Sequence, residues 1–206
     1  MVGKLFFPEE TMTMSKAHST FIGRLRGLLP KRHLALIDLA YTLAKHAYRY
    51  GKRDGERDLG RIAIIIIDEA GVREITTIVA ALLHDAARGR RGTLDVSKLE
   101  PLFGPDVGRV IDMVADAAPK PLGGDMDWRA LLVKAAEQLD VLRSLGTMDE
   151  AGVRRLIKET KEKHLPLLER LLSLAPRRYA RGVRFIRDAI IAIVSEYDEK
   201  RVPKRR

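Results

Sequence analysis

The stretch Ile75-Thr-Thr-Ile-Val-Ala-Ala-Leu-Leu-His-Asp-Ala-Ala87 decides most of what this chain can fold into. It follows Gly71 and is apolar on nearly every face, which is typical of a helix buried in a core. His84 and Asp85 stand near its end. A histidine next to a carboxylate on a buried helix can hold one divalent metal ion. The stretch therefore predicts a helix over 73–87 with a candidate metal site at its end.

Helical periodicity also dominates on both sides of this stretch. Apolar residues between Leu36 and Tyr50 recur at threes and fours, which predicts a helix over 31–50. The isoleucine-rich segment 61–69 is by itself typical of a buried strand. Because no partner strand is evident elsewhere, we predict a buried helix there instead. Segment 52–58 is expected to be a polar loop.

The second half of the chain predicts further helices, separated by glycine and proline signals. Thr93 is expected to cap a short helix that ends at Gly104. The other expected helices cover 105–117, 128–145, 149–174 and the region from Pro176, with a loop at 119–124. Pro166 must break or kink the helix over 149–174. The last helix should bury the face formed by Val183, Ile186, Ile190 and Val194. We therefore expect an all-α fold of about eight or nine helices.

The length of 206 residues favours one helical core. We expect that domain over 31–199, after an N-terminal extension (1–30) and before a basic C-terminal tail (200–206). Whether the extension packs on the core or on a partner stays open at this level.

The composition excludes some kinds of functional site and favours some kinds of partner. The chain has no cysteine, which excludes disulfides, thiolate zinc sites and cysteine nucleophiles. It has no segment suited to spanning a bilayer and no signal-peptide pattern, so a cytoplasmic protein without a membrane partner is expected. The net charge of +10 favours phosphate-rich partners, either a phosphorylated nucleotide or nucleic acid, although a general solubility surface explains it equally well. A homo-oligomer is also compatible with the sequence.

Three segments in order, residues 70–104, 132–145 and 159–171, resemble the hydrolase domain of RelA/SpoT-type alarmone enzymes, including the metazoan SpoT homologues. That domain is a branch of the HD-domain metal-dependent phosphohydrolases. The resemblance covers about 33–195. The family's third segment has a proline at the position of Pro166. The resemblance implies an HD-domain-like helical bundle and a (p)ppGpp-type nucleotide substrate.

The resemblance also implies a ligand set for a divalent metal, typically manganese. By position the ligands are Asp58, His84, Asp85 and Glu137, where Asp58 and Glu137 replace the family's first histidine and distant aspartate. Three carboxylates and one imidazole favour Mn²⁺ or Mg²⁺ over Zn²⁺. The longer Glu137 must be accommodated by its helix. His46 is a possible substitute ligand, although a lone helical histidine is more often structural. No organic cofactor is implied.

One departure from the family pattern affects catalysis directly. The alarmone hydrolases carry an acidic pair just after the His-Asp step, which is thought to position the attacking water, and this chain has Arg88 and Gly89 there. In one interpretation, Arg88 contacts substrate phosphates above a working metal. In the other, its guanidinium pairs with Asp85, Asp58 or Glu137 and occupies the place of the metal, which makes the protein a pseudoenzyme.

The resemblance further implies substrate-binding positions around the metal. These are Arg49, Lys52, Arg53, Arg88, Lys134, Arg143 and His164. Each has an alternative: the 49–53 loop can simply be solvated, and Arg143 can pair with a neighbouring acid. Asp140 can share the site or point away, and the family asparagine is Val141 here. The basic runs 154–163 and 177–184 can bind nucleic acid or form exposed helix faces.

Taken together, the residues and the resemblance predict a phosphohydrolase-like protein that acts on or binds a phosphorylated nucleotide, with altered or lost catalytic residues. The alternative is a non-catalytic module of the same fold that binds nucleotide or nucleic acid. If the protein is an enzyme, it is expected to be a metal-dependent nucleotide phosphohydrolase or pyrophosphohydrolase.

Overall fold

The computed structural model describes residues 16–50, 60–87, 94–115 and 126–199. Within these ranges the chain forms helices and turns and contains no β-strand, so the prediction of an all-α bundle is confirmed. None of the helices in the described ranges has the length and apolar character needed to cross a membrane. One continuous hydrophobic core joins the helices from both halves of the chain.

The first half contains α1 (Lys16–Leu25), α2 (Lys31–Tyr50), α3 (Arg61–Ile64), a π-helical turn η1 (Ile65–Glu69) and α4 (Ile75–Ala87). The short elements η2 (Val96–Lys98) and α5 (Glu100–Phe103) lead into α6 (Pro105–Ala115). The second half contains α7 (Trp128–Arg143), η3 (Leu145–Thr147), α8 (Glu150–Glu159), η4 (Thr160–His164), α9 (Leu165–Leu174), η5 (Arg177–Tyr179) and α10 (Ala180–Glu199).

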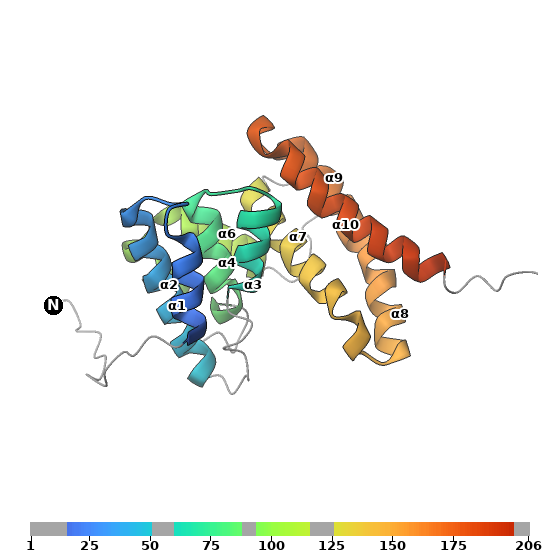
Figure 1. Ribbon diagram of the computed structural model, residues 1–206, viewed down its shortest axis with the longest axis horizontal. Helices are drawn as coiled ribbons and strands as arrows, with labels where there is room; N and C mark the ends of the chain where they lie inside the picture. The colour runs from blue at the N-terminus through green and yellow to red at the C-terminus, as the bar shows by residue number, and fades with distance from the viewer. Residues whose placement is uncertain (1–15, 51–59, 88–93, 116–125, 200–206) are drawn as a thin grey trace, which may run out of the picture.

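Helix α4 is the centre of the first half, as its apolar sequence predicted. Nearly all of its side chains are buried, and it packs against α2, α6 and α7. Helix α7 also packs against α9 and α10, so it joins the two halves (Figure 1). The end of α4 and the middle of α7 therefore belong to the same interior region, because both helices contribute to one core.

The isoleucine-rich segment forms a helix, as predicted, but its second half is a π turn. Ile65, Ile66 and Ile67 are all buried in the core. Gly60 precedes the helix with φ 93°, and a Cβ there would lie 3.0 Å from the Phe21 ring. Phe21 belongs to α1, so α1 packs directly against the start of α3. This answers the open question for residues 16–29: Phe21 and other apolar residues of that segment join the core.

Pro166 produces the predicted break through a π turn. Proline has no backbone N–H and clashes with the carbonyl four residues earlier in a regular helix. The chain widens into η4 over Thr160–His164, and Pro166 then falls in the first turn of α9, where its missing donor has no helical partner to lose. Helices α8 and α9 thus follow one another without an intervening loop.

Other boundaries differ in detail from the expectations. Asp95 caps η2, because its carboxylate accepts the Ser97 N–H at 3.0 Å. Thr93 and the loops expected at 52–58 and 119–124 lie outside the described residues. The regular turns of the last helix begin at Ala180, after the short η5, because Pro176 is extended (ψ 139°). The apolar face of α10 is buried as predicted.

Ionisation of Asp127, at the start of α7, is expected to make the stability of the fold depend on pH. Its carboxylate accepts the Arg129 N–H at 2.9 Å and pairs with the Arg129 guanidinium at 2.6 Å. Burial opposes ionisation of Asp127, but the Arg129 hydrogen bonds outweigh it and lower the pKa below 3.8. The folded state therefore binds fewer protons than the unfolded state as the pH falls through this range, and the ion-pair stabilisation present above pH 3.8 is lost below it.

We expect Asp127→Asn, which keeps a capping oxygen, to lower the free energy of unfolding by about 1–2 kcal/mol at neutral pH. The difference from wild type should shrink as the pH falls towards about 3, measured by urea unfolding across pH. Asp149→Asn is the matched control, because Asp149 also caps a helix, α8, through the Gly152 N–H at 2.8 Å. A difference that stays constant down to the lowest pH would contradict the assignment.

Candidate functional site

His84 is held in one orientation at the end of α4. Its side chain is 3% exposed, and Nδ1 lies 2.9 Å from the Ala81 carbonyl oxygen. Because a carbonyl only accepts hydrogen bonds, Nδ1 carries a proton, which leaves Nε2 as the lone-pair nitrogen of the neutral imidazole. Nε2 is buried, and no hydrogen-bond partner for it occurs among the described residues. A buried imidazole nitrogen fixed in this way is suited to bind a metal ion.

Asp85 and Glu137 bring carboxylates to the same place. Asp85 Oδ1 lies 3.6 Å from His84 Nε2. Glu137 reaches the pair from α7, and one ligand atom from each of the three residues falls within 4.8 Å of the others. The structure thus brings together three of the four predicted ligands, which lie up to 53 residues apart in the sequence. The extra methylene of Glu137 does not prevent its carboxylate from reaching the group.

The separations fit a shared ion. Two ligands of one Mg²⁺ or Mn²⁺ lie at most about 4.2–4.4 Å apart, twice a bond length of about 2.1–2.2 Å. The 3.6 Å separation between His84 and Asp85 is inside this limit, and because all separations are within 4.8 Å, a shift of a few tenths of an ångström brings the group to a shared ion. Two carboxylates and one imidazole form a mostly oxygen donor set, which suits a hard divalent ion. His46 and Asp140 are not in this group.

Two further predicted positions, Lys134 and His164, belong to α7 and η4, which pack against each other. Lys134 is one turn before Glu137 on α7, and its Nζ donates to the Val114 carbonyl at 3.0 Å, at the end of α6. His164 ends the π turn η4. Burial lowers the pKa of His164 most strongly, and the charges of Lys134 and Lys163 lower it further, whereas Glu159 and Glu137 oppose the shift. His164 is therefore neutral at pH 7 and presents an uncharged aromatic ring.

Arg143 forms an ion pair with Glu69. Its two terminal nitrogens donate to the two carboxylate oxygens of Glu69, each at 2.7 Å, and this pairing raises the pKa of Arg143. Asp140 accepts from Arg61 at 2.7 Å. Both pairs join α7 to α3 and η1. The structure therefore shows the acid-paired alternative for Arg143, and it directs Asp140 towards α3 rather than towards the three-ligand group.

The remaining predicted positions fall in undescribed parts of the chain. Asp58, Lys52, Arg53, Arg88 and Gly89 lie outside the described residues. Arg49 belongs to α2, but its side chain is outside the description. Their predicted roles stay predictions.

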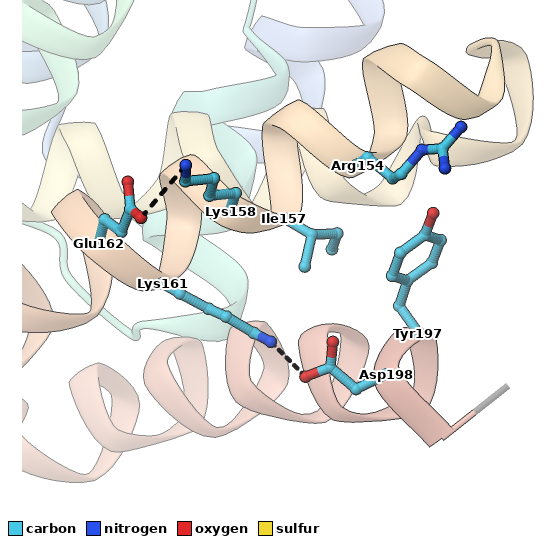
Figure 2. Close-up of a pocket in the computed structure, with 7 residues that line it drawn as sticks. All are labelled: Arg154, Ile157, Lys158, Lys161, Glu162, Tyr197 and Asp198. Carbon is cyan, nitrogen blue, oxygen red and sulfur yellow. Dashed lines mark hydrogen bonds and ion pairs between the residues drawn. The ribbon is translucent and has the colours of Figure 1, made fainter. Parts of the chain in front are cut away.

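The basic run on α8 borders a separate groove, shown in Figure 2. The groove measures about 360 Å³ and lies between α8, η4 and the end of α10. Its cations are matched by acids: Lys158 lies 3.8 Å from Glu162, and Lys161 pairs with Asp198 (Figure 2). Compensated charges of this kind are typical of a solvated helix face.

Sequence reasoning missed one buried polar contact next to the three ligands. Gln138 follows Glu137 on α7 and donates from Nε2 to Thr160 Oγ1 at 2.8 Å. Both residues are buried, at 6% and 0% exposure. A polar residue in an amphipathic helix is expected on the solvated face, so the pattern gave no signal that Gln138 points inward.

Comparisons with known proteins connect this geometry to a family. No protein-family model matches the chain. The chain is 30% identical over 174 residues to the GTP pyrophosphokinase rsh of Brucella melitensis. This alignment covers 73% of this chain and 22% of that protein. It is 28% identical over 206 residues to the probable GTP pyrophosphokinase of Mycobacterium leprae (84% and 26%). It is also 26% identical over 161 residues to the bifunctional (p)ppGpp synthase/hydrolase SpoT of Escherichia coli K12 (69% and 23%).

These relatives and the all-α fold both indicate the family that the sequence resembles. The chain carries a RelA/SpoT HD-type domain. The suspected family resemblance is thereby confirmed over most of the chain. This HD-type domain spans about a quarter of the length of the curated relatives that it matches.

Proposed function

We propose that this HD-type domain binds a divalent metal ion at His84, Asp85 and Glu137 and acts there on a phosphorylated nucleotide of the guanosine polyphosphate class. The observation that carries the proposal is the three-ligand group itself, in which the buried His84 Nε2 lies 3.6 Å from the Asp85 carboxylate. The relatives support the substrate class, because the Escherichia coli relative is named a bifunctional (p)ppGpp synthase/hydrolase.

The chain's own residues have distinct roles in this proposal. His84, Asp85 and Glu137 would hold the ion, with Asp58 as the predicted fourth ligand. A bound divalent ion would polarise the phosphoryl group and activate a water molecule. Lys134 lies one turn from Glu137 and can neutralise phosphate charge. The neutral ring of His164 can stack on the base, because its lowered pKa keeps it uncharged.

The test is release of pyrophosphate from guanosine tetraphosphate by the purified chain. We expect release to require added Mn²⁺ and to disappear when a chelator is present. A binding measurement with the same nucleotide should accompany it. Absence of both binding and hydrolysis at millimolar Mn²⁺ would contradict the proposal.

A second candidate function is non-catalytic nucleotide binding on the same fold. It is favoured by Arg88 and Gly89, which stand where the alarmone hydrolases carry their acidic pair. The double variant Arg88→Glu/Gly89→Asp separates the two functions. If the wild type binds nucleotide without hydrolysing it and only the double variant hydrolyses it, the protein is a nucleotide-binding pseudoenzyme. Hydrolysis by the wild type that is lost in Asp85→Ala identifies an enzyme.

A further inference from the structure

In the buried contact between α7 and η4, one hydroxyl both accepts and donates a hydrogen bond. Thr160 Oγ1 accepts from Gln138 Nε2 at 2.8 Å and donates to the Leu156 carbonyl at 2.7 Å. Thr160 is completely buried and Gln138 nearly so. A satisfied polar pair in an apolar interior defines one relative position of two helices, because any other position leaves a buried polar group without a partner.

The same threonine begins the π turn that ends at His164. A threonine hydroxyl that bonds the carbonyl four residues back tends to bend a helix. The turn η4 runs from Thr160 to His164, immediately before α9. Thr160 and His164 are thus the first and last residues of one widened turn.

Gln138 connects Thr160 to the helix that contributes to the three-ligand group. It is adjacent to Glu137 on α7, so its amide fixes η4 relative to the helix that supplies a carboxylate to the group. The turn η4 packs against α7, and Glu137 and Lys134, both on α7, act electrostatically on the His164 imidazole.

We infer that Gln138 and Thr160 are positioning residues that hold the turn η4, and with it His164, against the part of α7 that carries Glu137, so that His164 can bind the base of the nucleotide. The inference rests on the proposed function for its ligand. The pair acts through His164 and touches neither the ion nor the nucleotide. Its loss should therefore weaken nucleotide binding while metal binding is kept.

The test compares Thr160→Val, which keeps the shape but removes the hydroxyl, with Thr160→Ser, which keeps the hydroxyl. The full chain is titrated with Mn²⁺ alone and then with guanosine tetraphosphate in the presence of Mn²⁺. We expect Thr160→Val to weaken nucleotide binding about tenfold, with Mn²⁺ affinity within about twofold of wild type. Thr160→Ser should bind nucleotide like the wild type. Gln138→Met serves as a second variant if Thr160→Val does not fold.

A double-mutant comparison shows whether the effect passes through His164. If it does, Thr160→Val combined with His164→Ala binds nucleotide no more weakly than His164→Ala alone. Additive losses, or a loss of Mn²⁺ affinity equal to the loss of nucleotide affinity, would overturn the inference, because either result describes a general structural defect.

A readout without nucleotide separates this inference from the proposed function. The His164 imidazole NMR signals should shift in Thr160→Val and stay in place in Thr160→Ser. Unchanged signals in Thr160→Val overturn the positioning role. A wild type that binds no nucleotide overturns the proposed function, and with it the role of His164 in base binding.

Discussion

Alanine in place of Asp85 is expected to weaken Mn²⁺ binding by at least about 100-fold and to remove any metal-dependent release of pyrophosphate. The substitution deletes one of the three described ligands and leaves His84 Nε2 and the Glu137 carboxylate. Two remaining described ligands are too few to hold a hard ion against water. Isothermal titration with Mn²⁺ and a pyrophosphate assay measure the two effects.

The matched control is Asp188→Ala. Asp188 is an exposed aspartate on α10 that pairs with Arg187 at 2.8 Å. Its loss should leave Mn²⁺ affinity unchanged, because a surface ion pair contributes at most about 1 kcal/mol and lies outside the three-ligand group. If Asp85→Ala keeps wild-type Mn²⁺ affinity, the ion binds elsewhere.

Alanine in place of Gly182 is expected to cause the largest loss of stability. Gly182 lies near the start of α10, where a Cβ would fall 1.9 Å from the carbonyl oxygen of Ala70. The three atoms nearest to this Cβ are backbone atoms of Ala70, so no flexible side chain can move away to relieve the clash. The helix must shift instead, which disturbs the buried α10 face that packs on α7 and α9.

We expect Gly182→Ala to lower the free energy of unfolding by about 3 kcal/mol, a loss of about 6–12 °C in Tm. Gly23→Ala is the control: Gly23 lies in α1 and has open space around its Cβ position. That substitution should leave Tm unchanged or raise it slightly, because alanine favours a helix over glycine by about 1 kcal/mol. Equal Tm values for Gly182→Ala and wild type would mean that α10 lies farther from Ala70.

The sequence predicted the helices well where apolar periodicity was strong, as in α4 and α10. The isoleucine segment needed a global argument, because five isoleucines fit a buried strand or a buried helix equally well. The π turns were not predictable: only Pro166 marked the region of η4, and the extra residue per turn depends on what the helix packs against.

The three-ligand group followed from the resemblance and not from spacing alone. Residues 84 and 137 meet only because α4 and α7 pack together, which no local pattern encodes. The Arg143–Glu69 pair joins residues 74 apart, so the sequence left the role of Arg143 open. Gln138 was missed because hydrophobic periodicity does not distinguish a buried glutamine with a partner from an exposed one.

The most direct test of the account is a titration of the purified, metal-free chain with Mn²⁺, repeated with His84→Ala. The buried His84 Nε2 grouped with two carboxylates predicts one ion bound per chain, and predicts that binding is lost in the variant. No uptake by the wild type at millimolar Mn²⁺, or equal uptake by the variant, would contradict the central claim that His84, Asp85 and Glu137 form a metal site.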